Sequence, residues 1–139
     1  MKTYQTVFNI YFDGGTNGHQ LVSRDGYGSW EVEWNGFHKR VERAQFTAQA
    51  FGRKVTNNVA EWLSLIGALE FLASVKERGD YHVIIHGDSQ LVLNQLNGSY
   101  KAKNVVMREL RDTALKLAEG FTFATMWQKR THNVKRFGH

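Results

Sequence analysis

The chain has 139 residues, of which 42% are hydrophobic and 22% charged, so it is long and apolar enough to bury the core of one domain. It contains no cysteine, which excludes disulfides and thiolate chemistry and suits a reducing compartment, so we expect a cytoplasmic protein. The sequence shows neither a signal-peptide pattern nor the roughly 18 consecutive apolar residues of a membrane span. The formal net charge of +5 weakly favours a polyanionic partner.

Three strands are predicted in the first third of the chain. Residues 7–13, VFNIYFD, form a nearly continuous apolar run, which is typical of a strand buried on both faces. Residues 26–34, GYGSWEVEW, alternate between apolar and polar side chains, which predicts a half-exposed strand. The apolar side carries Trp30, Val32 and Trp34, and the polar side carries Ser29, Glu31 and Glu33. The sequence NGF at residues 35–37 predicts a hairpin that leads into a returning strand at residues 38–46.

The rest of the chain alternates between helices and strands. Apolar residues spaced by three and four predict a long helix over residues 58–77, ended by Gly79. Residues 81–88 and 121–127 are predicted as strands, and residues 89–98 and 102–120 as helices that end at glycine. This order predicts an antiparallel three-stranded unit followed by two strands that run parallel to the first. Because the chain has no proline, no repeat and no low-complexity stretch, we expect residues 1–139 to form a single domain.

Two acidic residues stand at the ends of predicted parallel strands. Asp13 closes the first strand, immediately before Gly14 and Gly15, and Asp88 closes the strand at residues 81–88. Ligands bind beyond the carboxyl ends of the strands in such sheets. The simpler interpretation of each is a helix N-cap or turn residue, and for Asp88 alone the two interpretations weigh about equally. Two acids on neighbouring strand ends repel each other unless a cation lies between them, which favours a functional site.

Glu61, in the sequence TNNVAEW, is a third candidate. Asn58 precedes it by three residues, which is the spacing of a capping box, and taken alone this interpretation is favoured. The first turn of the predicted helix is also expected to pack over the first strand. Glu61 is therefore a candidate to point toward Asp13.

The segments YFDGG, TNNVAE and HGDSQLVLNQL, in this order and spacing, resemble type 1 ribonuclease H over essentially the whole chain. The resemblance implies an α/β fold, with a mixed sheet of three antiparallel strands and then two parallel ones, flanked by helices. It also implies a monomeric endonuclease that cuts the RNA strand of RNA–DNA hybrids and leaves 5′-phosphate ends. The family binds two divalent ions, normally Mg²⁺ with Mn²⁺ as a substitute, through four acids. Asp13, Glu61 and Asp88 match the first three of these positions.

The resemblance also implies a set of substrate contacts. Hybrids are distinguished from DNA duplexes by 2′-hydroxyl groups in a wide, shallow minor groove, which short polar side chains and exposed backbone can reach. The matching positions are Gly14 and Gly15 near the RNA backbone, Asn57, Asn58 and Gln90 in the groove, Thr56 at a DNA-strand phosphate, and Asn17 in a loop that departs from the family pattern. The sequence TNN also suits an Asx turn before a helix, and both roles are compatible.

The end of the chain lacks a carboxylate, because no Asp or Glu follows Glu119. Family members usually present the fourth acid four residues after an Asn, and here that position is Phe137, which cannot bind a metal. If the preceding loop is shortened, Asn133 takes the fourth place, where its amide oxygen would coordinate a hard cation without adding charge. The alternative is that Asn133 is only a turn residue and the site has three acids.

Other residues near the end of the chain are further candidates. The family's basic insertion is absent, so positive charge for the substrate is expected from Lys129, Arg130, Lys135 and Arg136. His132 matches a mobile histidine that assists proton or product departure, and a surface histidine without a role is the alternative.

Two other functions compete with the endoribonuclease. A catalytically weak or inactive hybrid-binding module would keep the fold and groove without a competent fourth ligand. A 3′–5′ exonuclease of the wider superfamily would normally carry Asp-x-Glu at the first acid. Gly15 stands in place of that Glu, which counts against the exonuclease.

Overall fold

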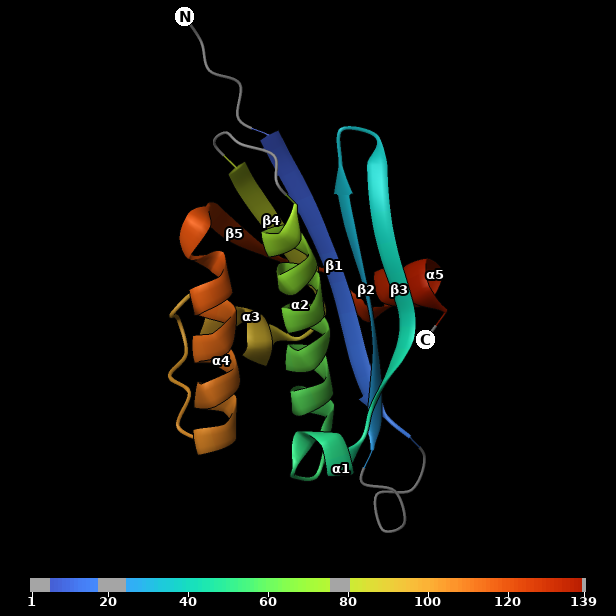
Figure 1. Cartoon of the computed structure of the whole chain (residues 1–139), viewed down its shortest axis with the longest axis vertical. Helices are drawn as coiled ribbons and strands as arrows, with labels where there is room; N and C mark the ends of the chain where they lie inside the picture. Colours follow the sequence, from blue (N-terminus) through green and yellow to red (C-terminus); the bar gives the residue numbers. More distant parts are fainter. Residues whose placement is uncertain (1–5, 18–24, 76–80, 139) are drawn as a thin grey trace, which may run out of the picture.

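A computed structural model of the chain describes residues 6–17, 25–75 and 81–138. Its centre is a five-stranded mixed sheet, seen in Figure 1. The antiparallel unit consists of β1 (Thr6–Thr16), β2 (Gly26–Trp34) and β3 (Phe37–Phe46), and β4 (Tyr81–Gly87) and β5 (Thr122–Trp127) run parallel to β1. The strand order is β3-β2-β1-β4-β5, so the predicted fold class is confirmed.

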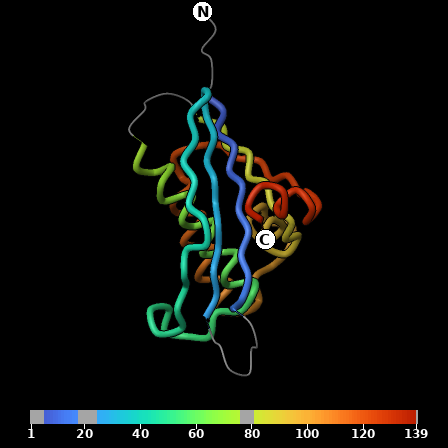
Figure 2. The backbone as a smooth tube through the Cα atoms, turned by 90° about the vertical axis from the view of Figure 1, so that its right-hand side faces the viewer, coloured from blue at the N-terminus to red at the C-terminus, as the bar shows by residue number. Residues whose placement is uncertain are grey.

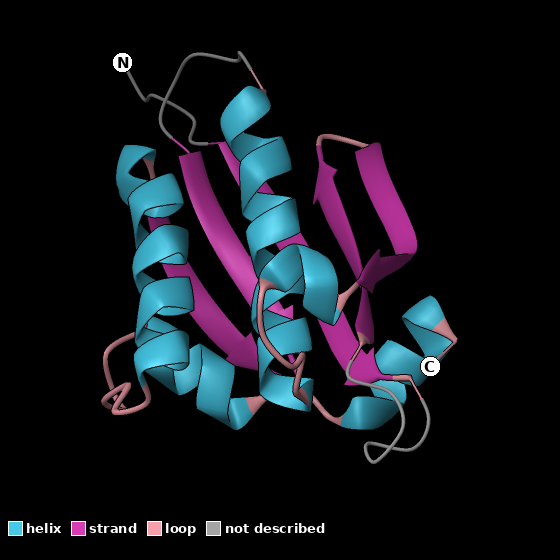
Figure 3. Cartoon of the chain, turned by 60° about the horizontal axis from the view of Figure 1, so that its bottom comes forward, coloured by secondary structure: helices cyan, strands magenta, loops and turns pink. Residues whose placement is uncertain are grey.

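Helices cover the two faces of the sheet unequally. The helices are α1 (Ala48–Phe51), α2 (Asn57–Ser74), α3 (Gln90–Leu96), α4 (Val105–Leu117), the short 3₁₀ helix η1 (Ala118–Gly120) and α5 (Arg130–Phe137). Figures 1 and 2 show α2 and α4 on one side of the sheet and α5 on the other. Figure 3 shows the same separation, with the last helix beside the label C. Among the described residues, no helix combines the length and the apolar character needed to cross a membrane.

The core lies between the sheet and α2. Alternate residues of β1 face α2, and the apolar residues of α2 recur at spacings of three and four residues. Each element therefore presents an apolar surface to the other. Side chains that are no more than 2% exposed include Trp62, Phe8, Phe12, Ile10, Leu65, Leu69 and Ile85. The indole N–H of Trp62 donates to Oε1 of Gln95 at 3.3 Å, which satisfies the one polar group that this large side chain buries.

The predicted half-exposed character of β2 is wrong. Ser29 is fully buried and Glu31 is only 4% exposed, although both lie on the polar side of the alternating pattern. The second face of the strand is covered at this point by α5, a helix whose own sequence is mostly polar. An alternating pattern reports which side chains are polar, and it does not report that a charged helix will cover them.

The bounds of β1 and the caps of two helices also differ from the predictions. β1 continues past Asp13 to Thr16 because Gly14 and Gly15 still pair with Gly28 and Tyr27 of β2. Asp13 therefore lies inside the strand, two residues beyond the last pair that β1 makes with β4.

Neither predicted acidic cap is present. The N-cap of α2 is Thr56, whose hydroxyl accepts a hydrogen bond from the Val59 N–H at 3.2 Å, so the capping box at Asn58 is wrong. The N-cap of α3 is Ser89, which accepts from the Val92 N–H at 3.2 Å, so Asp88 is not a cap. The helix α2 ends at Ser74, and the predicted stop at Gly79 lies outside the described residues. Glu61 and Asp88 are thus left for another role.

Candidate active site

The three acids predicted from the sequence line one cavity. Asp13 and Asp88 come from β1 and from the end of β4, which are adjacent and parallel, and Glu61 comes from the start of α2. The cavity has a volume of about 280 Å³. Its lining consists of Asp13, Gly14, Gly15, Thr16, Tyr27, Asn57, Glu61, Asp88 and Arg130. The prediction that Glu61 lies on the same side as Asp13 agrees with this shared lining.

Gly14 explains how α2 comes so close to β1. A Cβ atom at this position would lie 2.5 Å from the carbonyl carbon of Ala60 and 2.6 Å from the backbone nitrogen of Glu61. Only a residue without a side chain allows the first turn of α2 to rest against the strand. The glycine after Asp13 is therefore what brings the Glu61 side chain beside the Asp13 side chain.

Burial and nearby negative charge raise the pKa values of two of these carboxyls toward neutrality. Burial, with a contribution from the negative charge of Asp88, raises the pKa of Asp13 from 3.8 to about 7. Burial likewise raises the pKa of Glu61 from 4.5 to about 7, against a hydrogen bond from Ser89 that lowers it. The positive charge of Arg130 lowers the pKa of both carboxyls. Asp13 and Glu61 are thus both subject to nearby negative charge, and the cavity favours a cation.

Asn133 lies beside Asp13. It sits in α5, is fully buried, and lowers the pKa of Asp13 as a hydrogen-bond donor would. Neither its Oδ1 nor its Nδ2 makes a hydrogen bond of ordinary length with the described residues, so the amide is an incompletely satisfied polar group at the edge of the acids. Phe137, the position reached by counting four residues on, is buried beneath the Arg40 guanidinium instead, with its ring centre 5.4 Å away. Because Asn133 is helical, the interpretation of it as a turn residue is wrong.

The donor set fits a hard divalent cation. Carboxylate oxygens and an amide oxygen are ligands that Mg²⁺ accepts, and raised pKa values mean that a bound cation would displace protons from Asp13 and Glu61. Within the described residues, no three His, Asp or Glu side chains converge tightly enough to form a preassembled metal site.

Comparison with known proteins places the chain in a family. A family profile described as "Reverse transcriptase-like" matches residues 39–135. A ribonuclease HI of Halobacterium salinarum is 40% identical over 113 residues, which are 81% of this chain and 51% of that protein. The solved structure of RNase H1 from the same archaeon gives a TM-score of 0.65 at 29% identity, covering 91% of this chain and 89% of that one. The chain belongs to the type 1 ribonuclease H family.

A second relative of this ribonuclease H chain is a bifunctional protein of Mycobacterium tuberculosis. It is 34% identical over 126 residues, which are 90% of the chain and 32% of the mycobacterial protein. The chain therefore spans about a third of one relative and about half of the other. The family and the fold predicted from the sequence are confirmed by these comparisons.

His132 does not join the three acids of this cavity. It is exposed and lines a separate cavity of about 370 Å³, together with Glu31, Arg40, Gln128, Lys135 and Arg136. Successive residues on an α-helix point about 100° apart, so with Asn133 turned toward Asp13, His132 is turned away from it. The structure gives no support to the predicted grouping of His132 with the catalytic acids.

The predicted substrate residues surround the acid cavity to different degrees. Gly14, Gly15 and Asn57 line it directly. Thr56 caps α2, Asn58 is half-buried in the first turn of α2, and Gln90 is exposed at the first residue of α3. Asn17 follows the end of β1 and is not among the residues that line the cavity, and its amide donates to Oε1 of Gln45 at 3.1 Å.

Sequence reasoning missed two residues of the lining, Thr16 and Tyr27. They lie opposite Gly26 and Gly15 in the β1–β2 pairing. A sequence prediction would find them only if it continued the first strand past Asp13. Arg130 was expected only as part of the basic chain end, whereas it lines the acid cavity itself.

Proposed function

We propose that this chain is a metal-dependent endoribonuclease that hydrolyses the RNA strand of RNA–DNA hybrids and leaves 5′-phosphate ends. The observation that carries the proposal is the meeting of Asp13, Glu61 and Asp88 in one cavity beyond the β1–β4 pairing. These are the three residues that match the family's acidic motif. The ribonuclease HI activity named for the archaeal relative supports the same conclusion.

Two divalent ions, with Mg²⁺ preferred and Mn²⁺ as a substitute, belong to this proposal. Asp13, Glu61, Asp88 and the Asn133 amide oxygen would hold them. When bound, such ions neutralise the phosphodiester and activate the attacking water. The carboxyls must lose their protons to bind cations, so affinity is expected to rise as the pH increases through about 7.

The residues around the acids bind and orient the hybrid. Gly14 and Gly15 expose backbone at the cavity, where no side chain keeps the RNA strand at a distance. Asn57 offers a short amide at the cavity wall for a 2′-hydroxyl. Arg130 places a positive charge at the same wall, where a phosphate of the cut strand would lie.

The direct test uses a hybrid whose RNA strand is labelled internally and blocked at both ends, incubated with Mg²⁺ or Mn²⁺. Internal cleavage is expected, with products that a 5′-phosphate-dependent exonuclease degrades. Asp88→Asn is expected to abolish cleavage, while Asp112→Asn, on the exposed surface of α4, leaves it unchanged. RNA and DNA duplexes of the same sequence serve as substrate controls. Products that appear only from a hybrid with a free 3′ end would identify an exonuclease instead.

A hybrid-binding module without activity is the second candidate, and the neutral Asn133 beside Asp13 is the observation that favours it. Retained hybrid binding with no cleavage in either ion would establish it and refute the endoribonuclease. The role of Asn133 has its own test. Asn133→Asp is expected to tighten Mn²⁺ binding and to alter activity, and Asn133→Ala to lower activity. If both variants keep the metal dependence of the parent, Asn133 is not a ligand.

A further inference from the structure

The helix α5 brings Asn133 and Arg130 to the acids, yet little apolar packing holds it there. It has eight residues, and only Asn133 and Phe137 are buried. A helix of this length is not stable alone in water, so its position depends on tertiary contacts. One buried aromatic ring and one buried amide are a small anchor for the element that completes the cavity.

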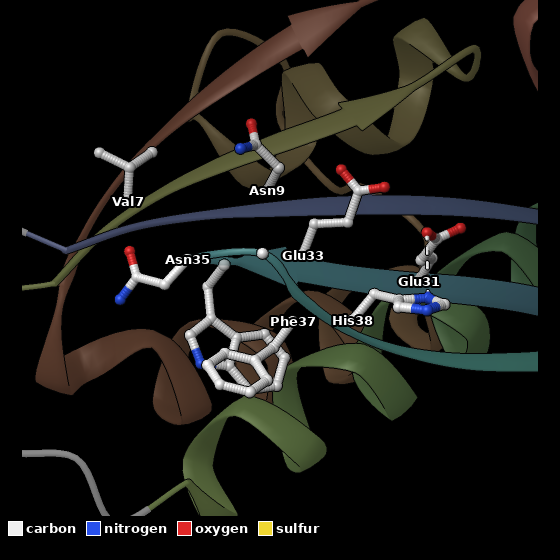
Figure 4. A pocket seen from close by; sticks show the side chains of 9 residues that line it. Val7, Asn9, Glu31, Glu33, Asn35, Phe37 and His38 are labelled. Atoms are coloured by element: carbon white, nitrogen blue, oxygen red, sulfur yellow. Dashed lines mark ion pairs between the residues drawn. The ribbon is translucent and has the colours of Figure 1, made fainter.

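Arg136 makes the main additional contact. Its guanidinium lies 3.3 Å from a carboxylate oxygen of Glu31 and 3.2 Å from one of Glu33, both on β2. The same group stacks on Tyr11 of β1, with its central carbon 3.4 Å from the ring centre. Figure 4 shows Glu31 and Glu33 projecting from β2, with His38 beside Glu31. One side chain of α5 thus reaches two neighbouring strands.

Arg40 of β3 makes a second set of contacts with the helix end. It pairs with Glu31 at 3.5 Å, lies over the Phe137 ring, and donates a hydrogen bond to the backbone carbonyl of Arg136. A cation at the last carbonyls of a helix satisfies acceptors that have no partner within the helix and interacts favourably with its dipole. The contacts therefore act on both the side chains and the backbone of α5.

Glu31 is the centre of this arrangement. Its side chain is 6% exposed, and a carboxylate buried to that degree is unfavourable without positive partners. Arg136 and Arg40 supply them, and Arg136 comes from α5 itself. If α5 left the sheet, Glu31 would lose one of its two arginines. If Glu31 were neutral, the arginines would lose their shared acceptor.

We propose that Arg136, Arg40, Glu31, Glu33 and Tyr11 form an ionic clamp that positions α5, and through it Asn133 and Arg130, against the catalytic acids. Arg136 is the positioning residue of this clamp. It lies one turn beyond Asn133 on the helix, so fixing its guanidinium over β1 and β2 fixes which way Asn133 faces. The effect on catalysis rests on the proposed function, whereas the docking of α5 does not.

Two substitutions test the clamp from opposite sides. Glu31→Gln and Arg136→Gln each remove one charge with little change in shape, and both are expected to loosen α5. The pair also separates positioning from a direct contact between Arg136 and a substrate phosphate. Glu31→Gln removes a negative charge and leaves Arg136 in place, so a phosphate-contact role predicts unchanged or tighter hybrid binding and full activity. The clamp predicts that Glu31→Gln resembles Arg136→Gln. The matched control is Arg111→Gln, which breaks an exposed pair with Asp112 on α4, on the other side of the sheet.

Amide hydrogen exchange of the metal-free protein is the first measurement, since it requires no activity. Both clamp variants are expected to exchange the α5 amides roughly tenfold faster or more, with β1 and α2 unchanged. Calorimetric titration with Mn²⁺ is expected to show weaker binding. On the hybrid, kcat is expected to fall roughly tenfold or more while KM changes less than about threefold, because misplacement affects the reacting groups more than the groove. Arg136→Lys, which keeps the charge but loses the planar fork, is expected to fall between the parent and Arg136→Gln.

Each outcome either supports or contradicts the clamp. Unchanged α5 exchange in both variants would overturn the clamp. Faster exchange with unchanged Mn²⁺ binding, and with unchanged kcat in an active parent, would reduce it to a stabilising contact and refute positioning. If the parent cleaves no hybrid, exchange and Mn²⁺ titration still decide the clamp, and only the proposed function fails. If Arg136→Gln does not fold, Arg136→Lys and Glu31→Gln provide the same comparison.

Discussion

Replacing Asp13 with asparagine is expected to stabilise the metal-free protein at neutral pH while removing the proposed endoribonuclease activity. Asp13 is 8% exposed, and burial, together with the charge of Asp88, raises its pKa from 3.8 to about 7. The folded state consequently holds a proton that the unfolded state releases between about pH 4 and pH 7. Stability therefore falls as the pH rises through this window, and it stays low above pH 7, where Asp13 is ionised in both states.

The magnitude follows from the same values. A pKa raised from 3.8 to about 7 corresponds to roughly 4 kcal/mol, because one pKa unit is about 1.36 kcal/mol. Asp13 shares its repulsion with the neighbouring acids, and relaxation of the cavity relieves part of it. We therefore expect Asp13→Asn to recover about half, or about 2 kcal/mol, above pH 7. For a domain of this size that is a rise in melting temperature of roughly 5–10 °C.

The assay is thermal or urea unfolding in a chelator at several pH values from 4 to 8, followed by circular dichroism. The parent is expected to lose stability with rising pH, and Asp13→Asn to show a weaker dependence and to match the parent near pH 4. Asp112→Asn, with an exposed carboxyl on α4, is the control and is expected to change little at any pH. If the acids bind Mg²⁺ in the folded state as proposed, added Mg²⁺ is expected to stabilise the parent more than Asp13→Asn.

Two results would refute the reasoning. Asp13→Asn could be less stable than the parent at pH 7.5 in chelator, which would mean that the carboxylate is stabilising as it stands. The gain could also be the same at pH 4 as at pH 8, which would tie it to shape or hydrogen bonding and not to charge.

Three further predictions concern the elements around the site. Gly14→Ala is expected to destabilise the fold by roughly 3 kcal/mol or more, measured by urea unfolding, because its Cβ would lie 2.5 Å from the Ala60 backbone, which cannot move without α2. Thr56→Ala is expected to cost about 1 kcal/mol in the same measurement by removing the cap of α2, and equal stability would refute that role. Burial lowers the pKa of His86 below its ordinary 6.5, so the unfolded state binds a proton that the folded state does not. The stability of the parent is therefore expected to decline as the pH falls below about 6.5. His86→Gln is expected to lose this decline when unfolding is measured from about pH 7 to about pH 5.

The sheet and the three acids were predictable because local patterns specify them. The apolar run of β1 and the 3.6 period of α2 locate both elements, and parallel strands place Asp13 and Asp88 at one edge. Glu61 is harder to predict as a site residue, because its spacing from Asn58 also fits a capping box. The structure resolves this through Thr56, whose hydroxyl accepts a hydrogen bond from the Val59 N–H, so the N-cap lies two residues earlier than the capping box requires.

Local sequence patterns could not predict what covers the second face of the sheet. Nothing in GYGSWEVEW indicates that Glu31 is buried, because its partner Arg136 lies 105 residues away in a segment that resembles a solvated basic tail. The same segment gives no signal that α5 turns Asn133 toward Asp13 and His132 away from it. Both facts depend on how a short helix docks, which follows from ion pairs between distant residues and not from periodicity.

The composition of the cavity suggests why a neutral residue stands beside Asp13. Three carboxyls already share the space, and two have pKa values near 7 even with the positive charge of Arg130 close by. A fourth carboxylate at the fully buried Asn133 would add further repulsion beside Asp13, where the Asn133 side chain now lowers the pKa. The amide avoids this and still offers an oxygen to a cation, with less attraction for it. If Asn133 is a ligand as proposed, Asn133→Asp is therefore expected to tighten Mn²⁺ binding and to lower the stability of the metal-free protein, which urea unfolding in chelator measures.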